Sequence, residues 1–355
     1  MELGYLGYSE DLEKFRIENN LTDFEVGRIT QEHKERYIVK TETNEYEAEI
    51  TGNMRFTAES RTDFPAVGDW VALTVCDSDF AVIHKIYPRK SILERQAIAK
   101  FGESQIIATN IDYAFITVAV DRDFNINRIE RYLTLCYSAK VEPIVLLSKT
   151  DLINESELDK LLSDAKNRLK DIKIFPLSSE TKFGYENLKS ILISGKTYCF
   201  LGSSGVGKST VINNLIGKEI MKTSNISTST NKGRHTTSHR ELFILENGSI
   251  LIDNPGMREI GIADASDGLE ITFDSIIQLS QKCKFTDCTH TVEKGCAVLD
   301  AVENNIIDKD TYKNYLKMER EKIHYQSSVY EKRKKDKQFG KMANEVMKYK
   351  KQNKF

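Results

Sequence analysis

The residues from Gly202 to Ser209 have the types and spacing of a phosphate-binding loop. The run Gly-Ser-Ser-Gly-Val-Gly-Lys-Ser fits the pattern G-x-x-x-x-G-K-[ST]. Glycines let backbone N–H groups turn toward phosphate oxygens, and the helix behind such a loop presents its positive end to the phosphates. Lys208 would supply a charge to the β- and γ-phosphates, and the Ser209 hydroxyl would bind Mg²⁺. The alternative is a glycine-rich turn without a ligand. The predicted nucleotide contacts in this region are Gly202, Ser203, Ser204, Gly205, Val206, Gly207, Lys208, Ser209 and Thr210.

A second motif follows the loop at a distance typical of nucleotide hydrolases. Asp253-Asn254-Pro255-Gly256 has the form D-x-x-G and comes after an apolar run. We expect Asp253 to hold Mg²⁺ through water and the Gly256 N–H to meet the γ-phosphate. The alternative is a simple Pro-Gly turn after a strand.

The residues that would read guanine lie before the phosphate-binding loop. Ser148-Lys149-Thr150-Asp151 ends the apolar run 144–147. A carboxylate at Asp151 can accept both the ring N–H and the exocyclic amine of guanine, a pair that adenine does not offer. Lys149 would lie over the base. Ser148 stands where an Asn usually braces the neighbouring loops, and a hydroxyl makes only part of that bracing. The alternative for this string is a helix cap before Leu152.

The order of these motifs is the reverse of the usual one, in which the guanine motif follows the phosphate-binding loop by about a hundred residues. Nothing suitable lies downstream here. Ser178 and Ser179 follow another short apolar run, where a backbone N–H would contact the guanine oxygen. The chain is therefore predicted to be a circularly permuted GTPase.

The segment 224–238 is dense in Ser, Thr, Lys and Gly and lies where a switch loop should be. Its Thr236 and Thr237 hydroxyls are candidates for Mg²⁺ and the γ-phosphate. Met257 stands where many GTPases carry a water-orienting Gln, and a thioether cannot orient water. His235 is therefore the candidate catalytic residue, as orienter or general base. The alternatives are a plain loop and an exposed histidine.

Four residues of metal-ligating type gather within fourteen positions near the C-terminus, in the spacing C-x4-C-x-H-x5-C. Three thiolates and one imidazole form a closed tetrahedral Zn²⁺ set, so the predicted ion is structural. The ligands are Cys283, Cys288, His290 and Cys296. The alternative is free cysteines beside a chance histidine. Cys76, Cys136 and Cys199 are scattered in apolar stretches and are expected to be ordinary core residues.

Composition fits a multidomain protein without a membrane span. The chain has 355 residues, 40% hydrophobic and 29% charged, with a net charge of −2. No apolar run approaches the roughly 20 residues of a spanning helix, and the first residues lack a secretory signal, so a cytoplasmic protein is expected. Residues 1–100 hold 19 acidic and 13 basic residues (−6), whereas 331–355 hold ten basic and three acidic ones (+7). The basic tail fits contact with RNA or an acidic surface, or equally a solvated helical face.

Three predicted domains follow an N-terminal arm, residues 1–20. Five short alternating segments in residues 21–103 indicate a β-barrel of OB type, either RNA-binding or purely structural. An RNA contact would use a local patch at Lys85, Arg89, Lys90, Arg95 and Lys100. Strands alternating with helices in 104–263 indicate a parallel α/β sheet carrying the GTPase motifs. Residues 264–355 are predicted to be a mostly helical zinc-binding domain with the basic tail. Within it, 269–281 and 309–330 should be helices.

The motifs resemble the RsgA/YjeQ family of ribosome small-subunit-dependent GTPases. The similarity rests on Gly-Arg-His-Thr-Thr at 233–237, Asp-Asn-Pro-Gly-Met-Arg-Glu at 253–259 and the Cys-Cys-His-Cys spacing. It implies GTP hydrolysis stimulated by the small ribosomal subunit, a role in late subunit maturation, and rRNA contact through the barrel and zinc domain. It also implies that His235 is catalytic. Ser148 departs from the family's usual Asn, which bears on nucleotide affinity. No feature suggests an oligomer, so a monomer is expected.

The permuted order suggests a mechanism, since the residues after Gly256 lead directly into the zinc domain. In this hypothesis the GTP form docks on the subunit, docking orders the His235 loop, and hydrolysis releases the protein. The alternatives are an RNA-binding assembly scaffold with a vestigial GTPase, and a permuted GTPase with another RNA or protein partner.

Overall fold

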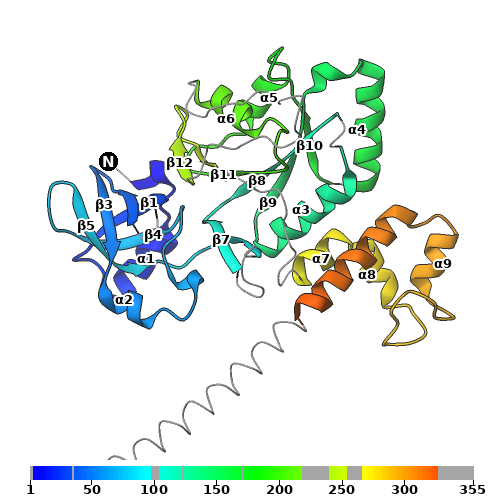
Figure 1. Cartoon of the computed structure of the whole chain (residues 1–355), viewed down its shortest axis with the longest axis horizontal. Coiled ribbons are helices and arrows are strands. Elements are labelled where there is room, and N and C mark those ends of the chain that lie inside the picture. The colour runs from blue at the N-terminus through cyan, green and yellow to red at the C-terminus, as the bar shows by residue number, and fades with distance from the viewer. Residues whose placement is uncertain are drawn as a thin grey trace, which may run out of the picture.

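Five strands close into a barrel near the N-terminus (Figure 1), as the sequence predicts. The computed structural model describes residues 3–33, 36–96, 104–121, 124–169, 171–217, 240–253 and 266–326. The barrel order is β1-β2-β3-β5-β4, and β1 pairs again with β4 to close it. Only the β3–β5 pair of this barrel is parallel. The strands are β1 (Glu25–His33), β2 (Arg36–Lys40), β3 (Glu45–Ile50), β4 (Trp70–Val75) and β5 (Phe80–Ile86).

Alternation along these strands fills the barrel interior. Tyr37 and Val39 of β2 are buried, as are Tyr46, Ala48 and Ile50 of β3. A short helix, α2 (Gly52–Thr57), follows β3 and is capped by the Thr51 hydroxyl. These inward side chains belong to one apolar cluster, so the barrel interior is a packed core.

The predicted N-terminal arm is a helix packed on the barrel. A 3₁₀ turn, η1 (Leu3–Leu6), precedes α1 (Glu10–Glu18). Phe15 of α1 packs against Tyr87 with the rings tilted and their centroids 5.3 Å apart, and Leu6 is wholly buried. The arm thus shares a small apolar core with Trp70.

The predicted basic patch is partly committed to internal contacts. The Arg89 guanidinium forms a two-pronged ion pair with Asp69, at 2.6 and 2.8 Å, and also donates to the Thr62 and Phe64 carbonyls. Lys90 pairs with Asp112 at 2.8 Å. Arg89 therefore holds the barrel together and is not free to bind RNA.

A hairpin joins the barrel to the next domain. Strands β6 (Ile92–Gln96) and β7 (Ser104–Thr109) pair antiparallel. The predicted boundary between residues 103 and 104 falls in the connection between them, and the domain limits remain predictions. The hairpin packs on the GTPase core through Leu93, Ile107 and Ala108.

A six-stranded sheet follows, in the order β10-β9-β8-β11-β13-β12. All neighbours are parallel except β12 and β13. The strand that feeds the phosphate-binding loop, β11, comes late in the sequence yet lies in the middle of this sheet, beside β8, the first of its strands in sequence. The strands are β8 (Tyr113–Ala119), β9 (Glu142–Ser148), β10 (Lys173–Pro176), β11 (Thr197–Leu201), β12 (Glu241–Ile244) and β13 (Ile250–Asp253).

Helices cover both faces of this sheet, as right-handed crossovers require. α3 (Ile126–Ser138) and α4 (Glu155–Leu169) pack on one face, and α5 (Tyr185–Ser190) and α6 (Lys208–Ile216) on the other. A 3₁₀ turn, η3 (Thr150–Leu152), follows β9. α3 is amphipathic, and it buries Ile129, Leu133 and Cys136 on the face toward the sheet.

The barrel and the GTPase sheet are one hydrogen-bonded sheet. β1 pairs antiparallel with β12 at Gln31 and Glu241, whose side chains also bond at 2.7 Å. Behind this contact the wholly buried Arg28 donates to the Leu6, Gly68 and Asn110 carbonyls and to Thr197 Oγ1. Thr197 begins β11, so a barrel arginine is bonded to the strand that leads to the phosphate-binding loop.

The C-terminal part is helical, with α7 (Ser266–Thr272), α8 (Asp274–Ser280), α9 (Ala297–Glu303) and a helix over residues 309–326. Residues 269–281, predicted as a single helix, are divided between α7 and α8 at Phe273. Phe273 leaves helical geometry (φ −112°, ψ 32°) and is buried against Tyr315, with centroids 5.5 Å apart. Packing of this ring therefore overrides the local helical pattern.

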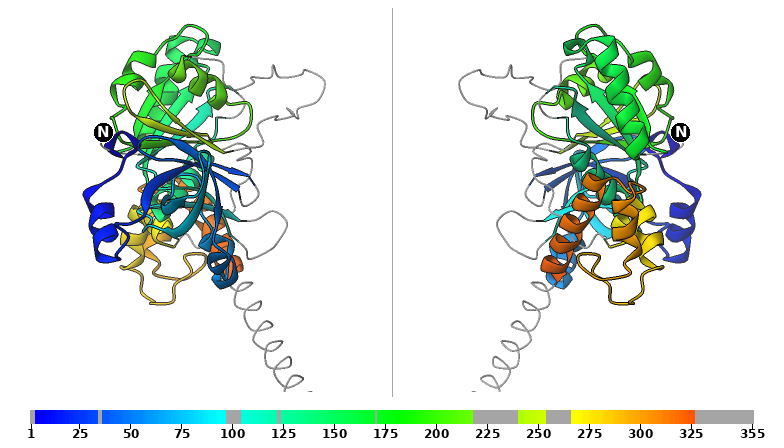
Figure 2. Two further views of the ribbon diagram at one scale, coloured as in Figure 1. Left: turned by 90° about the vertical axis from the view of Figure 1, so that its left-hand side faces the viewer. Right: turned by 90° about the vertical axis from the view of Figure 1, so that its right-hand side faces the viewer.

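Figure 1 shows the barrel and the C-terminal part on different sides of the GTPase sheet, and both views of Figure 2 place the C-terminal part below that sheet. Among the helices that the structure describes, none has the length and apolar character needed to cross a membrane. The three scattered cysteines differ in burial. Cys136 and Cys199 are buried as expected, whereas Cys76 is exposed. Cys76 follows the last residue of β4 in a turn, so its apolar sequence neighbours did not predict its exposure.

Candidate nucleotide site and metal centre

The phosphate-binding loop depends on glycine at three positive-φ positions. Gly202, Gly205 and Gly207 have φ of 143°, 84° and 94°. At Gly202 a Cβ would also lie 2.3 Å from the Thr117 carbonyl oxygen of β8. These glycines therefore allow the sharp turn between β11 and α6, which other residues would make only with strain.

Lys208 lies at the start of α6 and reaches back across the loop. Its ammonium donates to the Gly202 and Ser203 carbonyls, at 2.7 and 2.5 Å. Burial lowers the pKa of Lys208 to about 8, although the Asp253 carboxylate opposes this shift. In this structure the two carbonyls are the hydrogen-bond acceptors of the ammonium.

Ser148 bonds directly to the phosphate-binding loop. Its hydroxyl donates to the Val206 carbonyl at 2.6 Å and lies 3.4 Å from the Val118 carbonyl. A hydroxyl has one proton, so the shorter contact is the working bond. The buried Ser148 thus braces the loop after β11 from the end of β9, two strands away.

The guanine-reading candidates come together from two loops. Asp151 accepts a 2.6 Å bond from the Ser178 hydroxyl, which brings the ends of β9 and β10 side by side. Lys149 adopts the left-handed conformation (φ 61°) and its ammonium pairs with Asp121 at 2.9 Å. Ser179 bonds to the Tyr185 hydroxyl at 2.8 Å. The Ser178 N–H donates to the Phe183 carbonyl at 3.1 Å, so it is already bonded within the protein.

Asp253 ends β13 with 4% of its surface exposed. It neighbours Lys208 closely enough to favour the charged ammonium. Ser209 and Thr210 lie in the first turn of α6, at the same edge of the sheet. Four predicted site residues, Gly256, His235, Thr236 and Thr237, lie outside the described residues.

The predicted metal ligands form one cluster. The ligand atoms of Cys283, Cys288, His290 and Cys296 all lie within 4.8 Å of one another. Cys283 Sγ and Cys296 Sγ are 3.8 Å apart, and His290 Nδ1 lies 3.6 and 3.5 Å from them. Tetrahedral zinc with Zn–S near 2.3 Å and Zn–N near 2.0 Å would place its ligands at about these separations. The residues present therefore fit a closed structural zinc site.

Local structure holds this cluster in shape. His290 has φ 59°, and its carbonyl accepts a 2.6 Å bond from the Tyr312 hydroxyl. Burial lowers the pKa of His290, so its imidazole is neutral and has a lone pair for a metal. Cys296 caps α9, since its sulfur accepts from the Leu299 N–H at 3.4 Å. Two helices are thus tied to the cluster.

The comparisons with known proteins decide the family. A family model described as RsgA GTPase matches residues 86–263. Small ribosomal subunit biogenesis GTPase RsgA 1 of Bacteroides thetaiotaomicron is 38% identical over 98% of this chain and 97% of its own length. The chain belongs to the RsgA GTPase family. Small ribosomal subunit biogenesis GTPase RsgA of Methanosarcina acetivorans is also 38% identical, over 97% of this chain and 92% of its own length.

Solved structures agree with this membership. YjeQ from Thermotoga maritima is similar with a TM-score of 0.62 at 26% identity, over 83% of this chain and 96% of its own. YloQ, described as a circularly permuted GTPase, gives a TM-score of 0.59 at 22% identity, over 88% and 96%. The latter supports the fold alone. This RsgA-family chain is a GTP hydrolase with permuted motif order, as predicted from the position of Asp151 before Lys208.

Two residues near the nucleotide site of this RsgA-family GTPase escaped sequence analysis. Asp121 follows β8 and holds Lys149. Arg128, in the first turn of α3, donates to the Ser203 hydroxyl at 3.0 Å. Neither belongs to a recognisable motif. The available signal was positional, since both follow β8, which we expected to lie in the same parallel sheet as β11.

Proposed function

We propose that this protein binds the small ribosomal subunit and hydrolyses GTP to GDP and phosphate during late subunit maturation, with release coupled to hydrolysis. The observation that carries the nucleotide part is the hydrogen bond from Ser148 to Val206. It ties the guanine motif to the phosphate-binding loop at the carboxyl edge of one parallel sheet, where ligands of such sheets bind. The ribosomal part rests on the names of the relatives.

Each site residue has a proposed role in the reaction. Asp151 accepts the two guanine donors, and Lys208 meets the β- and γ-phosphates in place of the Gly202 and Ser203 carbonyls. Ser209 and Asp253 hold Mg²⁺, directly and through water, with Thr236 or Thr237 as a further ligand. Water attacks the γ-phosphorus and the bond to the β,γ-bridging oxygen breaks, which leaves GDP and phosphate. We propose that His235 orients this water, because Met257 cannot.

The zinc ion is proposed to be structural. Cys283, Cys288, His290 and Cys296 supply four ligands, which leaves no open position for chemistry. The apolar core of the C-terminal part is small and includes Cys296 itself. A metal cross-link would therefore stabilise a domain that has little core of its own.

Release is proposed to follow from chain connectivity. Asp253 is separated from α7 by residues 254–265 alone. A change at the γ-phosphate would therefore act on the zinc domain through a short covalent link. We further propose that barrel and zinc domain contact rRNA, that the protein acts as a monomer and that it works in the cytoplasm.

The first test is GTP hydrolysis by the purified protein with and without small ribosomal subunits. We expect strong stimulation with GTP, none with ATP, and loss of turnover in Lys208→Ala. Intact subunit binding without stimulation, and unchanged function of Lys208→Ala in vivo, would indicate the RNA-binding scaffold instead. Absence of subunit binding would indicate another partner.

The release step needs a separate measurement. Sedimentation with subunits should show tighter binding in the presence of a non-hydrolysable GTP analogue than in the presence of GDP. Equal binding of the two forms would refute coupling of release to hydrolysis while leaving the GTPase assignment intact.

A further inference from the structure

We propose that helix α3 couples the phosphate-binding loop to the zinc domain, with Arg128 as the positioning residue that links it to Ser203. This route differs from the chain connection after Asp253. It rests on the proposed function in one respect, that Lys208 binds the phosphates of GTP.

The first step is the contact at the loop. The Arg128 guanidinium donates to Ser203 Oγ at 3.0 Å, and the Ser203 carbonyl accepts the Lys208 ammonium at 2.5 Å. Ser203 is therefore bonded to both the phosphate-binding lysine and α3. When the ammonium moves to phosphate oxygens, Ser203 loses one of these partners, and its side chain and Arg128 can adopt a new arrangement.

The second step is the face that α3 presents to the zinc domain. Asn127, Glu130, Arg131 and Thr134 recur at the spacing i, i+3, i+4, i+7, so they share one face of the helix. The opposite face packs on the sheet through Ile129 and Cys136. A stripe of polar residues at this spacing usually faces water, yet here Glu130 and Thr134 are buried.

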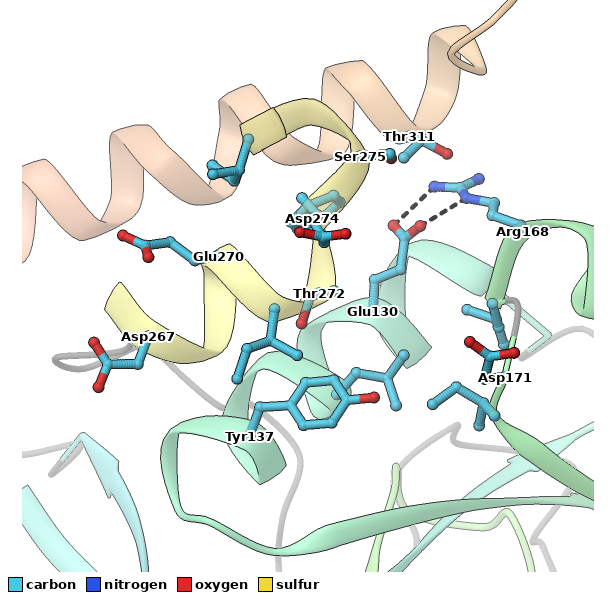
Figure 3. A pocket seen from close by; sticks show the side chains of 16 residues that line it. Glu130, Tyr137, Arg168, Asp171, Asp267, Glu270, Thr272, Asp274, Ser275 and Thr311 are labelled. Atoms are coloured by element: carbon cyan, nitrogen blue, oxygen red, sulfur yellow. Dashed lines mark hydrogen bonds and ion pairs between the residues drawn. The ribbon is translucent and has the colours of Figure 1, made fainter. Parts of the chain in front are cut away.

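Partners from the zinc domain explain this burial. Glu130 accepts bonds from Asn314 at 2.5 Å and from Arg168 of α4 at 2.8 Å to each oxygen. Figure 3 shows the Glu130–Arg168 pair beneath the zinc-domain helices. Arg131 pairs with Glu321 at 2.7 Å. The Arg131 pair lies one helical turn from Arg128.

Close backbone approach completes this contact. Thr134 bonds to Thr272 of α7 at 2.9 Å, and a Cβ at Gly268 would lie 2.0 Å from the Thr134 carbonyl oxygen. α7 therefore lies directly on α3. A groove of about 630 Å³ lined by α3, α4, α7 and α8 adjoins it (Figure 3), which leaves neighbouring side chains space to change rotamer. One 13-residue helix, roughly 20 Å long, thus contacts both the loop and the zinc domain.

The test is backbone hydrogen exchange in α7 (Ser266–Thr272), measured in the full-length protein with GDP and with a non-hydrolysable GTP analogue. Each protein is compared at nucleotide concentrations that saturate it. We expect the wild type to show a difference between the two nucleotides and Arg128→Ala to reduce it by about half or more. Arg128→Lys keeps a donor and should retain part of the difference. Arg36→Ala removes an exposed arginine of the barrel and should retain all of it.

A double-mutant cycle makes the test specific to this contact. If Arg128 acts through Ser203, then Arg128→Ala combined with Ser203→Ala should reduce the difference no further than either change alone. A full nucleotide-dependent difference in Arg128→Ala would overturn the coupling role of α3. Failure of the wild type to bind GTP in a direct titration would instead overturn the proposed function. The two failures are therefore distinguishable.

Discussion

The barrel is joined to the GTPase domain by a continued β-sheet around a buried arginine, whereas the zinc domain is joined mainly by contacts of helix α3. We call the first the barrel joint (Arg28, Gln31, Asn110, Thr197 and Glu241) and the second the zinc joint (Glu130, Arg131, Thr134, Thr272 and Asn314). Strand pairing and a guanidinium with four acceptors allow little relative movement. The zinc joint has close backbone packing at Gly268, but its side-chain pairs border a groove and can change rotamer there. The comparison suggests that the barrel and GTPase domain move as one body and that nucleotide-dependent movement occurs at the zinc joint.

The largest effect should come from removing zinc, because the metal-binding free energy of such sites is on the order of 10 kcal/mol. Chelation, or Cys296→Ser, should unfold α7 to α9 while the barrel joint persists. Zinc content should fall from one ion per chain toward none, and hydrogen exchange should rise in α7 to α9. Trp70, the single tryptophan, is buried at the barrel joint and should keep its emission.

The matched control is Cys76→Ser, since Cys76 is exposed and remote in sequence from the metal ligands. It should retain zinc and normal exchange. Unchanged exchange in α7 to α9 after zinc loss would show that the C-terminal part does not depend on the metal.

Arg28→Met should have the next largest effect, and at the other joint. It leaves the Leu6, Gly68 and Asn110 carbonyls without this buried donor, at a cost of about 3 kcal/mol or more. The Arg28 guanidinium lies 5.5 Å from the centroid of the Trp70 ring, so Trp70 emission follows unfolding of this region. The unfolding midpoint should therefore occur at a lower urea concentration in Arg28→Met than in the wild type. Zinc content should not change. Arg36→Ala, whose side chain is 72% exposed, should cost no more than about 0.5 kcal/mol. An equal effect of both changes would contradict the rigid barrel joint.

Ser148→Ala should weaken nucleotide binding while leaving both joints intact. It removes one buried hydrogen bond to the phosphate-binding loop, worth about 1 kcal/mol, so GTP affinity should fall roughly fivefold. Fluorescence titration with a labelled nucleotide measures this loss. Ser190→Ala on α5, which removes an exposed hydroxyl, serves as the control. Altered Trp70 emission or zinc loss in Ser148→Ala would show that the joints and the site are not separate.

The smallest effect concerns pH. The pKa of Lys208 is lowered to about 8 without nucleotide, and bound phosphates would raise it again. Binding therefore favours the protonated lysine, so affinity should be constant well below pH 8 and decline above it. Between pH 7.5 and 8.5 we expect about a threefold loss. The decline should vanish in Lys208→Met, whose much weaker binding is measured over the same range. A rise in wild-type affinity for GTP between pH 7.5 and 8.5 would contradict the expected direction of the pH dependence.

Sequence alone predicted the parts of this fold that depend on local patterns. The five barrel strands were predicted from alternation, because that spacing is a property of neighbouring residues. The break at Phe273 could not be predicted, since it depends on a ring 42 positions away, Tyr315. The pairing of β1 with β12 joins residues 210 positions apart and has no local signal.

The candidate site shows the same division. Glycines and a lysine at fixed spacing predicted the phosphate-binding loop, and ligand types at fixed spacing predicted the Cys283 cluster. Arg128 and the polar stripe around Glu130 were not predicted, because a polar helix face has the same sequence pattern whether it contacts water or another domain. The roles of His235 and Gly256 remain predictions from sequence.

The pairing of β1 with β12 also has a consequence for solubility. Without the barrel, β12 would expose a row of unsatisfied N–H and C=O groups beside Leu242 and Phe243. Another chain could then pair with this edge as an added strand. The opposite edge strand, β10, is as short as β12 but contains Lys173 and Pro176, which discourage such addition. A GTPase domain cut away from its barrel should therefore tend to aggregate through one edge only.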